Sequence, residues 1–325
     1  MELLKELTQI NSPSGREDKI REFILNQIKD DNYDTSTDTL GNIIVHKKGN
    51  GKKIMIAAHM DEIGIIVSFI DKNGFIRFSS LGGLEVKELP RRKVVFENGT
   101  IGVIGTDKAF VDKTELSNLY VDIGAKDKNE AEKIVNVGDT AVFVGEYFEN
   151  DNIIVSKAVD NRVGCFILLD IIKNNIITEN DLYFVFTAQE EVGLRGAKTS
   201  AYSILPDLAF SVDVTDTGDF PDSPEMDVKL GGGAAIKAMD RSIVCDKEVF
   251  KTLVDIAEKE KIMYQTEIMS DGGTDAGAIS LTASGVKTGG ISIPVRYIHS
   301  PSEMADKNDI DCCIKLLKGV CTYNW

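Results

Sequence analysis

The sequence FTAQEEVGLRGA, residues Phe186–Ala197, begins at the last residue of the apolar run LYFVF, residues 182–186. That run has the length and the aromatic and β-branched composition of a buried strand, and Glu190 and Glu191 stand where the strand should end. Adjacent carboxylates repel each other and are costly to remove from water. Their position therefore predicts a compensating partner, and bound divalent cations would provide one.

Around this stretch, the pattern after Val155 predicts a layered α/β sheet. Two long helical patterns, DNRVGCFILLDIIKNN (160–175) and KEVFKTLVDIAEKEK (247–261), alternate with the apolar strand patterns LYFVFT, DLAFSVDV and KTGGISIP. Helices that alternate with buried strands are typical of an α/β fold. We expect a three-layer α/β domain.

The N-terminal segment adds two short amphipathic helices, separated by the break NSPSG (11–15). Ser14 and Glu17 fit a capping box that would begin the second helix. The apolar residues that the two helices would bury are Leu3, Leu4, Leu7 and Ile10 in the first, and Ile20, Phe23, Ile24 and Ile28 in the second.

The middle of the chain changes to short β-type runs, among them GFIRF, KVVF, TIGVIG, LYVDIG and GDTAVFVG, which Gly, Asn and Asp turn signals separate. This pattern is typical of a small β-barrel or sandwich. Two independent domains in series are an alternative, but the N-terminal segment has too few elements to close a core alone. We therefore predict a discontinuous α/β domain, residues 1–64 and 154–325, interrupted by a β-rich domain, residues 65–153.

The composition excludes several classes of partner. The chain has 325 residues, with 37 basic and 52 acidic side chains and a formal charge of −15 that is spread along its length. Nucleic acid and anionic membranes are therefore not expected partners. There is no signal-peptide pattern or apolar run long enough to span a membrane, and the five cysteines form no CxxC pair. We expect a reduced, cytoplasmic protein.

Side chains that can bind metals gather where strands should end or helices should begin. In layered α/β sheets, ligands bind outside the carboxyl ends of the strands. The candidates are His59, Asp61 and Glu62 in IAAHMDEIG, Asp160 in KAVDNRVG, Glu190 and Glu191 in TAQEEVG, Asp213 in FSVDVTD, and His299 in YIHSPSE.

Each candidate also has an ordinary structural interpretation. His59 could make a routine hydrogen bond, Asp160 could cap the helix that follows it, and His299 could be an incidental loop residue. Asp213 has the weakest such alternative, because an acid that closes a buried strand has little structural use there. Together, the imidazoles and carboxylates fit two divalent ions, with zinc and cobalt favoured and manganese as a further option.

Asp61 is expected to act behind His59. The two residues are two apart, so they point to the same face if IMIAAHMD continues as a strand. A metal-binding imidazole usually donates its second N–H to a carboxylate, which fixes its orientation.

Six stretches carry a resemblance over essentially the whole chain: AAHMDEIG, VDNRVG, QEEVGLRGA, SVDVTD, GGTDAGAI and RYIHSPSEM. In this order they resemble the M42 family of metallo-aminopeptidases, the glutamyl aminopeptidase or TET-like group of the di-metal exopeptidase clan. The M20 deacylases and peptidases use similar ligands, but their extra domain interrupts a later part of the chain. Here the β-rich insertion lies between His59 and Asp160.

The resemblance implies a role for each matched residue. His59 and Asp213 would hold one metal, Glu191 and His299 the other, and Asp160 would bridge both. Glu190 would be the general base that activates a metal-bridging water, with Asp61 supporting His59. In DGGTDAGAI, Thr274 could cap a helix or, with Asp275, help to bind substrate.

The expected function is therefore removal of the N-terminal residue from peptides by a di-metal aminopeptidase. The resemblance also implies that the β-rich domain is a dimerisation domain and that dimers assemble into a tetrahedral dodecamer. An endoglucanase-type glycoside hydrolase and an M20-like metal-dependent deacylase are the alternative activities. A non-enzymatic scaffold on the same fold is a third class, which the retained Glu190 argues against.

Overall fold

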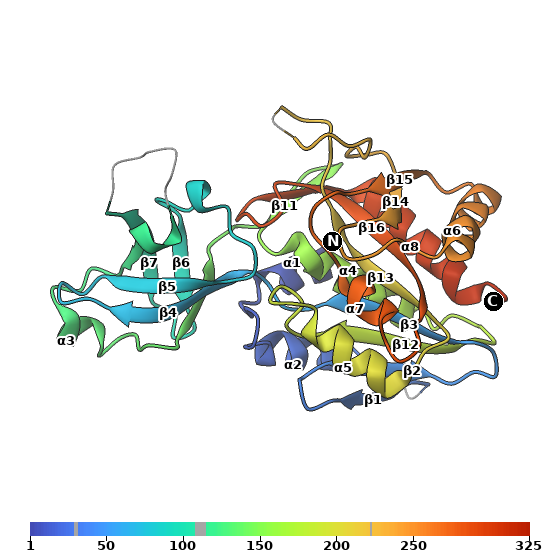
Figure 1. The fold of residues 1–325 in the computed structure, drawn as a ribbon, viewed down its shortest axis with the longest axis horizontal. Coiled ribbons are helices and arrows are strands. Elements are labelled where there is room, and N and C mark those ends of the chain that lie inside the picture. The colour runs from blue at the N-terminus through green and yellow to red at the C-terminus, as the bar shows by residue number, and fades with distance from the viewer. Residues whose placement is uncertain (29–31, 108–114, 222) are drawn as a thin grey trace.

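The computed structural model describes residues 1–28, 32–107, 115–221 and 223–325. It shows an α/β domain and a smaller closed barrel that projects from one side of it (Figure 1). A mixed sheet of 11 described strands forms the centre of the α/β domain. Its strands are β1 (Asp34–Thr37), β2 (Ile43–Lys47), β3 (Lys53–His59), β10 (Phe148–Glu149), β11 (Ile153–Ser156), β12 (Asp181–Thr187), β13 (Leu208–Thr215), β14 (Ala234–Met239), β15 (Tyr264–Ile268), β16 (Lys287–Arg296) and β17 (Glu303–Asp306).

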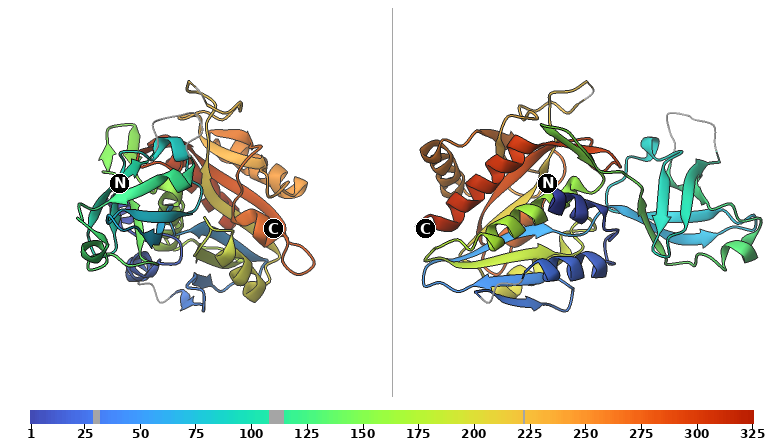
Figure 2. Two further views of the ribbon diagram at one scale, coloured as in Figure 1. Left: turned by 60° about the vertical axis from the view of Figure 1, so that its left-hand side comes forward. Right: turned by 180° about the vertical axis from the view of Figure 1, so that it is seen from behind.

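Helices cover both faces of this sheet. Its main path runs β1-β2-β12-β3-β13-β16-β17-β11-β10, and β14 joins it by pairing with β16. Figure 1 views the face with α5 and α7, and the right-hand view of Figure 2 shows the other helices on the opposite face. The helices of this domain are α1 (Glu2–Gln9), α2 (Asp18–Gln27), α4 (Val159–Lys173), α5 (Arg195–Ile204), α6 (Lys247–Glu260), α7 (Asp275–Ser280) and α8 (Lys307–Thr322).

Strand β3 shows why the domain has three layers. Ile54 and Ile56 pack into the large core with α1, α2, α4, α6 and α8, whereas Met55 and Ala57 pack into a second core with α5 and α7. Successive side chains of a strand point to opposite faces, so a strand whose central residues are all apolar is buried on both sides. The expected three-layer α/β domain is confirmed.

The barrel has its own core. Its strands close in the order β4-β5-β8-β7-β6-β9, and Ile65, Val67 and Val121 are among the side chains buried inside. Its elements are β4 (Gly64–Ile70), β5 (Ile76–Leu81), the 3₁₀ turns η1 (Val86–Glu88) and η2 (Leu116–Asn118), β6 (Lys93–Phe96), β7 (Ile101–Thr106), β8 (Leu119–Asp122), α3 (Lys128–Ala131) and β9 (Thr140–Phe143). The expected β-rich insertion is therefore a closed barrel.

The barrel is shorter than the range 65–153 that the sequence predicted. Its last strand ends at Phe143, and β10 pairs with β11 in the large sheet instead. Both stretches have β-type sequences, and only the tertiary pairing assigns the second one to the α/β domain.

The two N-terminal helices form as expected, but the predicted capping box is wrong. Glu17 occupies the N-cap position of α2 without a side-chain cap bond, and its carboxylate accepts the N–H groups of Gly15 and Gln189. The Ser14 hydroxyl instead donates to Asp61 at 2.6 Å. The segment that the sequence suggested as a helix start therefore contacts the strand ends.

All five cysteines are free and buried. Within the described residues, every helix is too short or too polar to cross a bilayer.

Candidate metal centre

The strand-end candidates converge on one edge of the sheet. His59 is the last residue of β3, and Asp213 lies near the end of the neighbouring parallel strand β13. Glu190 and Glu191 follow β12, which is parallel to β3 on its other side. Parallel strands bring their carboxyl ends to the same edge, where α/β sheets commonly bind ligands.

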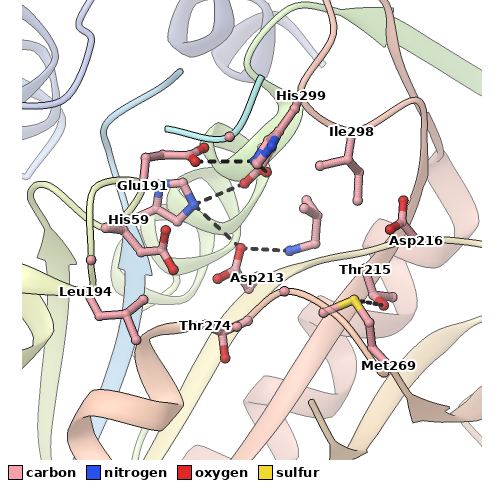
Figure 3. Close-up of a pocket in the computed structure, with 17 residues that line it drawn as sticks. His59, Glu191, Leu194, Asp213, Thr215, Asp216, Met269, Thr274, Ile298 and His299 are labelled. Carbon is pink, nitrogen blue, oxygen red and sulfur yellow. Dashed lines mark hydrogen bonds and ion pairs between the residues drawn. The ribbon is translucent and has the colours of Figure 1, made fainter. Parts of the chain in front are cut away.

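Two residues reach this edge from elsewhere in the chain. Asp160 lies at the start of α4, and His299 lies in the turn between β16 and β17, with a backbone φ of 62°. Together with the strand-end residues they line a pocket of about 510 Å³, in which the side chains of His59, Glu191, Asp213 and His299 point toward one another (Figure 3).

The side chains form two sets of potential ligand atoms that share one residue. His59, Asp160 and Asp213 make up the first set, and Asp160, Glu191 and His299 the second; within each, the atoms lie within 4.8 Å of one another. His59 Nε2 is 3.0 Å from Asp160 Oδ1 and 3.6 Å from Asp213 Oδ1. His299 Nε2 is 3.2 Å from Glu191 Oε2 and 3.4 Å from Asp160 Oδ2.

Burial and charge crowding shift the ionisation of this cluster. Burial raises the pKa of Asp213 and of Glu190 well above the ordinary carboxyl value. Burial alone would lower the pKa of His59, but the charges of Glu190 and Asp213 outweigh it and raise that pKa well above the usual imidazole value. His299 follows the same pattern, with its pKa raised chiefly by Glu191 and Asp160 against the effect of burial.

These shifts have one physical meaning. The acids stabilise positive charge on both imidazoles. Bound cations would supply that positive charge instead of the protons on the imidazoles. Asp160 is the exception among the acids: burial raises its pKa, but hydrogen bonds with His299 and His59 outweigh burial and hold the pKa well below its ordinary value.

The donor set fits divalent cations. Among the described residues that line the pocket, none is a lysine or an arginine. Glu191 Oε1 is buried and has no hydrogen-bond partner among the described residues. A buried carboxylate oxygen without a hydrogen-bond donor is costly, and imidazole and carboxylate ligands suit zinc and similar ions.

Asp61 links His59 to the glutamate pair from behind. Its carboxylate lies 3.5 Å from His59 Nδ1 and accepts the backbone N–H groups of Glu190 at 3.0 Å and Glu191 at 3.3 Å. It also accepts the Ser14 hydroxyl and is fully buried. One carboxylate therefore faces an imidazole and accepts backbone N–H groups of both glutamates, a wider set of contacts than the sequence suggested.

Glu303 is a residue of this site that sequence reasoning missed. Its carboxylate accepts the backbone N–H of Asp160 and that of His299, each at 2.9 Å. It is buried, and burial raises its pKa well above the usual value. The quoted stretch RYIHSPSEM contains Glu303, but its sequence gives no sign that the side chain turns back to these two backbones.

Glu62, in contrast, lies outside the centre. Its carboxylate binds Lys157 Nζ at 2.7 Å and Arg162 Nη2 at 3.4 Å, and it accepts the backbone N–H of Ser12. The grouping of Glu62 with the metal-competent side chains is therefore wrong, because the chain provides its counter-ions.

Thr274 and Asp275 lie at different depths. Thr274 lines the pocket and donates its hydroxyl to Asp240 at 3.2 Å; it occupies the N-cap position of α7 without a side-chain cap bond. Asp275 is buried behind the pocket lining and accepts the Thr187 hydroxyl at 2.5 Å. Burial raises the pKa of Asp275 to about 6.

Comparisons with known proteins identify the family of the chain. A family model described as M42 glutamyl aminopeptidase matches residues 41–316. A putative aminopeptidase of Acetivibrio thermocellus is 51% identical over 98% of this chain and 98% of that protein. A lysyl aminopeptidase of Pyrococcus furiosus and a glutamyl aminopeptidase of Lactococcus lactis subsp. cremoris are each 32% identical over 98% of this chain, and over 96% and 95% of their own lengths.

Solved structures share the whole fold. Aminopeptidase APDkam598 from the archaeon Desulfurococcus kamchatkensis has a TM-score of 0.93 and 42% identity, covering 98% of this chain and 93% of that one. The TET1 peptidase of Pyrococcus horikoshii, described as assembling into a tetrahedron or a large octahedral shell, has a TM-score of 0.88 and 36% identity over 99% and 98% of the two chains. A Thermotoga maritima protein named as an endoglucanase has a TM-score of 0.83 and 36% identity over 98% and 96%.

Proposed function

The chain belongs to the M42 family of glutamyl aminopeptidases and is a peptide hydrolase, and on that premise we propose that it releases the N-terminal residue of peptides with two divalent cations. The observation that carries the proposal is the pair of ligand sets that share Asp160 beside Glu190. Zinc or cobalt suits these ligands best, with manganese as a third option.

The proposed ligand roles follow the two sets. His59 and Asp213 would hold one cation, Glu191 and His299 the other, and Asp160 would contribute one carboxylate oxygen to each. Bound there, the cations would polarise the scissile carbonyl and make water a stronger nucleophile at neutral pH.

Glu190 is proposed as the general base. It lines the pocket but belongs to neither ligand set, and burial raises its pKa well above that of an ordinary carboxyl group. A carboxylate with a raised pKa accepts a proton more readily near neutrality. One of its carboxylate oxygens would take the proton of the attacking water and then deliver it to the nitrogen of the leaving amine.

Two carboxylates are proposed to position this machinery rather than to react. Asp61 holds the backbone of Glu190 and Glu191 while it faces His59, so the base and two ligands depend on one buried group. Glu303 holds the backbones of Asp160 and His299 in the same way. Interactions of this kind keep ligands in place before the metal or the substrate arrives.

The barrel is proposed to mediate dimerisation. It exposes the large apolar side chains Phe69, Ile101, Val103 and Val137, although most of its apolar residues face its own core. A related structure, PhTET1-12s, is a dodecamer, with 35% identity and a TM-score of 0.89 over 99% of this chain and 98% of that one. We propose the same tetrahedral assembly of dimers, which the mass of the protein in solution would test.

The experiment that tests the function compares two substrates before and after metal removal. The protein, loaded in turn with zinc, cobalt and manganese, is expected to cleave leucyl-p-nitroanilide, to lose this activity with a chelator, and to regain it when metal returns. Carboxymethylcellulose is the second substrate, because a glycosidase requires two carboxyl groups on either side of a sugar bond and gives the histidines no role. Metal-independent cleavage of the cellulose, without cleavage of the amide, would contradict the proposal.

A further inference from the structure

Asp216 lines the pocket on the wall opposite Glu191 (Figure 3). It directly follows β13 and lies near Ile298 and Thr215 (Figure 3). It is half-buried and belongs to neither set of potential ligands. Within the described residues, its carboxylate has no hydrogen bond or ion pair.

Among the described residues, no lysine or arginine forms an ion pair with Asp216. Burial and the charges of Asp160 and Glu267 raise its pKa, and only His299, a proposed metal ligand, acts in the opposite direction. The buried cation Lys237 is already paired with Asp240 and with Glu267, one of the acids that act on Asp216. Cations bound by the ligand sets would offset the acids of those sets, which leaves the charge of Asp216 facing the pocket.

The same wall also offers apolar surface. Met269 and Ile298 line the pocket with Asp216, and Leu194 lies across from them (Figure 3). An aliphatic stem that ends in a positive charge matches such a surface, because long basic side chains bury their methylene groups and keep the charged end on a polar partner.

We propose that Asp216 binds the cationic side chain of the substrate's first residue, so that the enzyme selects peptides that begin with lysine or arginine. The inference rests on the proposed aminopeptidase function and names its substrate class. A first residue with a carboxylate would meet Asp216 without a balancing lysine or arginine among the described pocket residues, and like charges brought together are strongly unfavourable. The preference would therefore run against glutamyl substrates, although the family model carries the glutamyl name.

The α-ammonium group of the substrate is the other cation that Asp216 could bind. The two cases differ in which substrates depend on Asp216. A contact with the α-ammonium group affects every peptide equally, whereas a contact with the side chain affects only the basic ones. Comparison of lysyl and leucyl substrates separates them, because both have an α-ammonium group.

The test measures kcat/KM for lysyl-, arginyl-, leucyl- and glutamyl-p-nitroanilide with the metal-loaded wild type and with Asp216→Asn. We expect the wild type to cleave the lysyl and arginyl substrates most efficiently and the glutamyl one least. Asp216→Asn is expected to reduce kcat/KM for the basic substrates about 10- to 100-fold, with a much smaller change for the leucyl one. Asp216→Lys should shift the preference further, toward the glutamyl substrate.

Asp271→Asn is the matched control. Asp271 is exposed and precedes the pocket residue Gly272, but it does not line the pocket, so this variant removes a nearby charge without the proposed contact. It is expected to retain the wild-type preferences. A wild type without preference for lysyl over glutamyl substrates, or an equal loss of lysyl and leucyl cleavage in Asp216→Asn, would overturn the inference. Failure of the metal-loaded wild type on all four substrates would instead overturn the proposed function together with it.

Discussion

Two buried clusters of charged side chains take residues from the same two motifs and differ in how their charge is balanced. The junction cluster, Glu62, Lys157 and Arg162, lies where the chain leaves the sheet for the barrel and returns from it. The ligand cluster consists of His59, Asp160, Glu191, Asp213 and His299. The first contains a carboxylate with two cations of the chain, whereas the second has three carboxylates and no lysine or arginine among the described pocket residues.

These two motifs each contribute residues to both clusters. In HMDE, His59 faces the ligand cluster and Glu62 faces the junction cluster. In KAVDNR, Asp160 belongs to the ligand cluster, while Lys157 and Arg162 reach Glu62. Buried charges require partners. An acid-rich motif therefore indicates a candidate metal site only where the fold places no lysine or arginine beside the acids.

The largest expected effect comes from the shared ligand. Asp160→Asn is expected to lose both metals and nearly all activity, because this residue contributes an oxygen to each ligand set. Metal analysis of the purified protein, together with kcat on leucyl-p-nitroanilide, measures both effects. Asp170→Asn, on the same helix and outside both clusters, is the control and should retain two metals per chain. Two metals in Asp160→Asn would contradict the bridging role.

The next largest effect is expected at Glu190, and it distinguishes the proposed base from the adjacent proposed ligand, Glu191. Glu190→Gln is expected to reduce kcat about 10²- to 10⁴-fold with its metal content unchanged, because the amide cannot accept the proton. Glu191→Gln is the matched comparison: it should lose metal, because Glu191 belongs to the second ligand set. If Glu190→Gln lost metal instead, Glu190 would be a ligand and the assignment of roles would be wrong.

The sequence predicted the α/β layers and the candidates at the strand ends because both depend on local patterns. Apolar runs such as LYFVF identify strands, and parallel strands necessarily bring residues such as His59 and Asp213 to one edge. It could not predict partners that tertiary folding selects. Glu62 lies three residues from His59, yet the chain turns toward the barrel at Gly64, and Glu62 meets Lys157 instead.

Each side chain whose contacts were missed also binds a residue far away in the chain. Ser14 and Glu17 have the spacing of a capping box, but Asp61 and the Gln189 backbone provide their hydrogen bonds. Glu303 follows His299 closely, yet it also holds the backbone of Asp160 across the site. Local propensity describes a helix start or a loop, and it carries no information about which distant group will compete for the side chain.

The junction cluster is expected to contribute to stability and not to metal binding. Lys157→Met leaves Glu62 with a weaker set of partners in a buried position, and removal of one partner of a buried ion pair typically costs about 3–5 kcal/mol. The free energy of unfolding in urea measures this, and the metal content should stay at the wild-type level. A loss of metal in this variant would show that the two clusters are not independent.

The control for this variant is an exposed ion pair of equal length. Lys48 Nζ lies 2.7 Å from Asp34 Oδ2, the same distance as in the pair of Lys157 and Glu62, but both side chains are largely exposed. Exposed pairs contribute little because water screens them. Lys48→Met is therefore expected to unfold at nearly the same urea concentration as the wild type, and an equal loss in both variants would mean that burial is not the cause.

The smallest effect is expected at Asp61, which supports the ligand cluster from behind. Asp61→Asn should weaken metal affinity or activity by about 10- to 100-fold, because the amide replaces one acceptor oxygen with a donor that faces backbone N–H groups. Ser14→Ala removes only one donor to Asp61 and should have a weaker effect in the same metal titration. Loss of both metals in Asp61→Asn would make it a ligand like Asp160. Wild-type affinity and activity would mean that the Glu190 and Glu191 backbones hold their position without it.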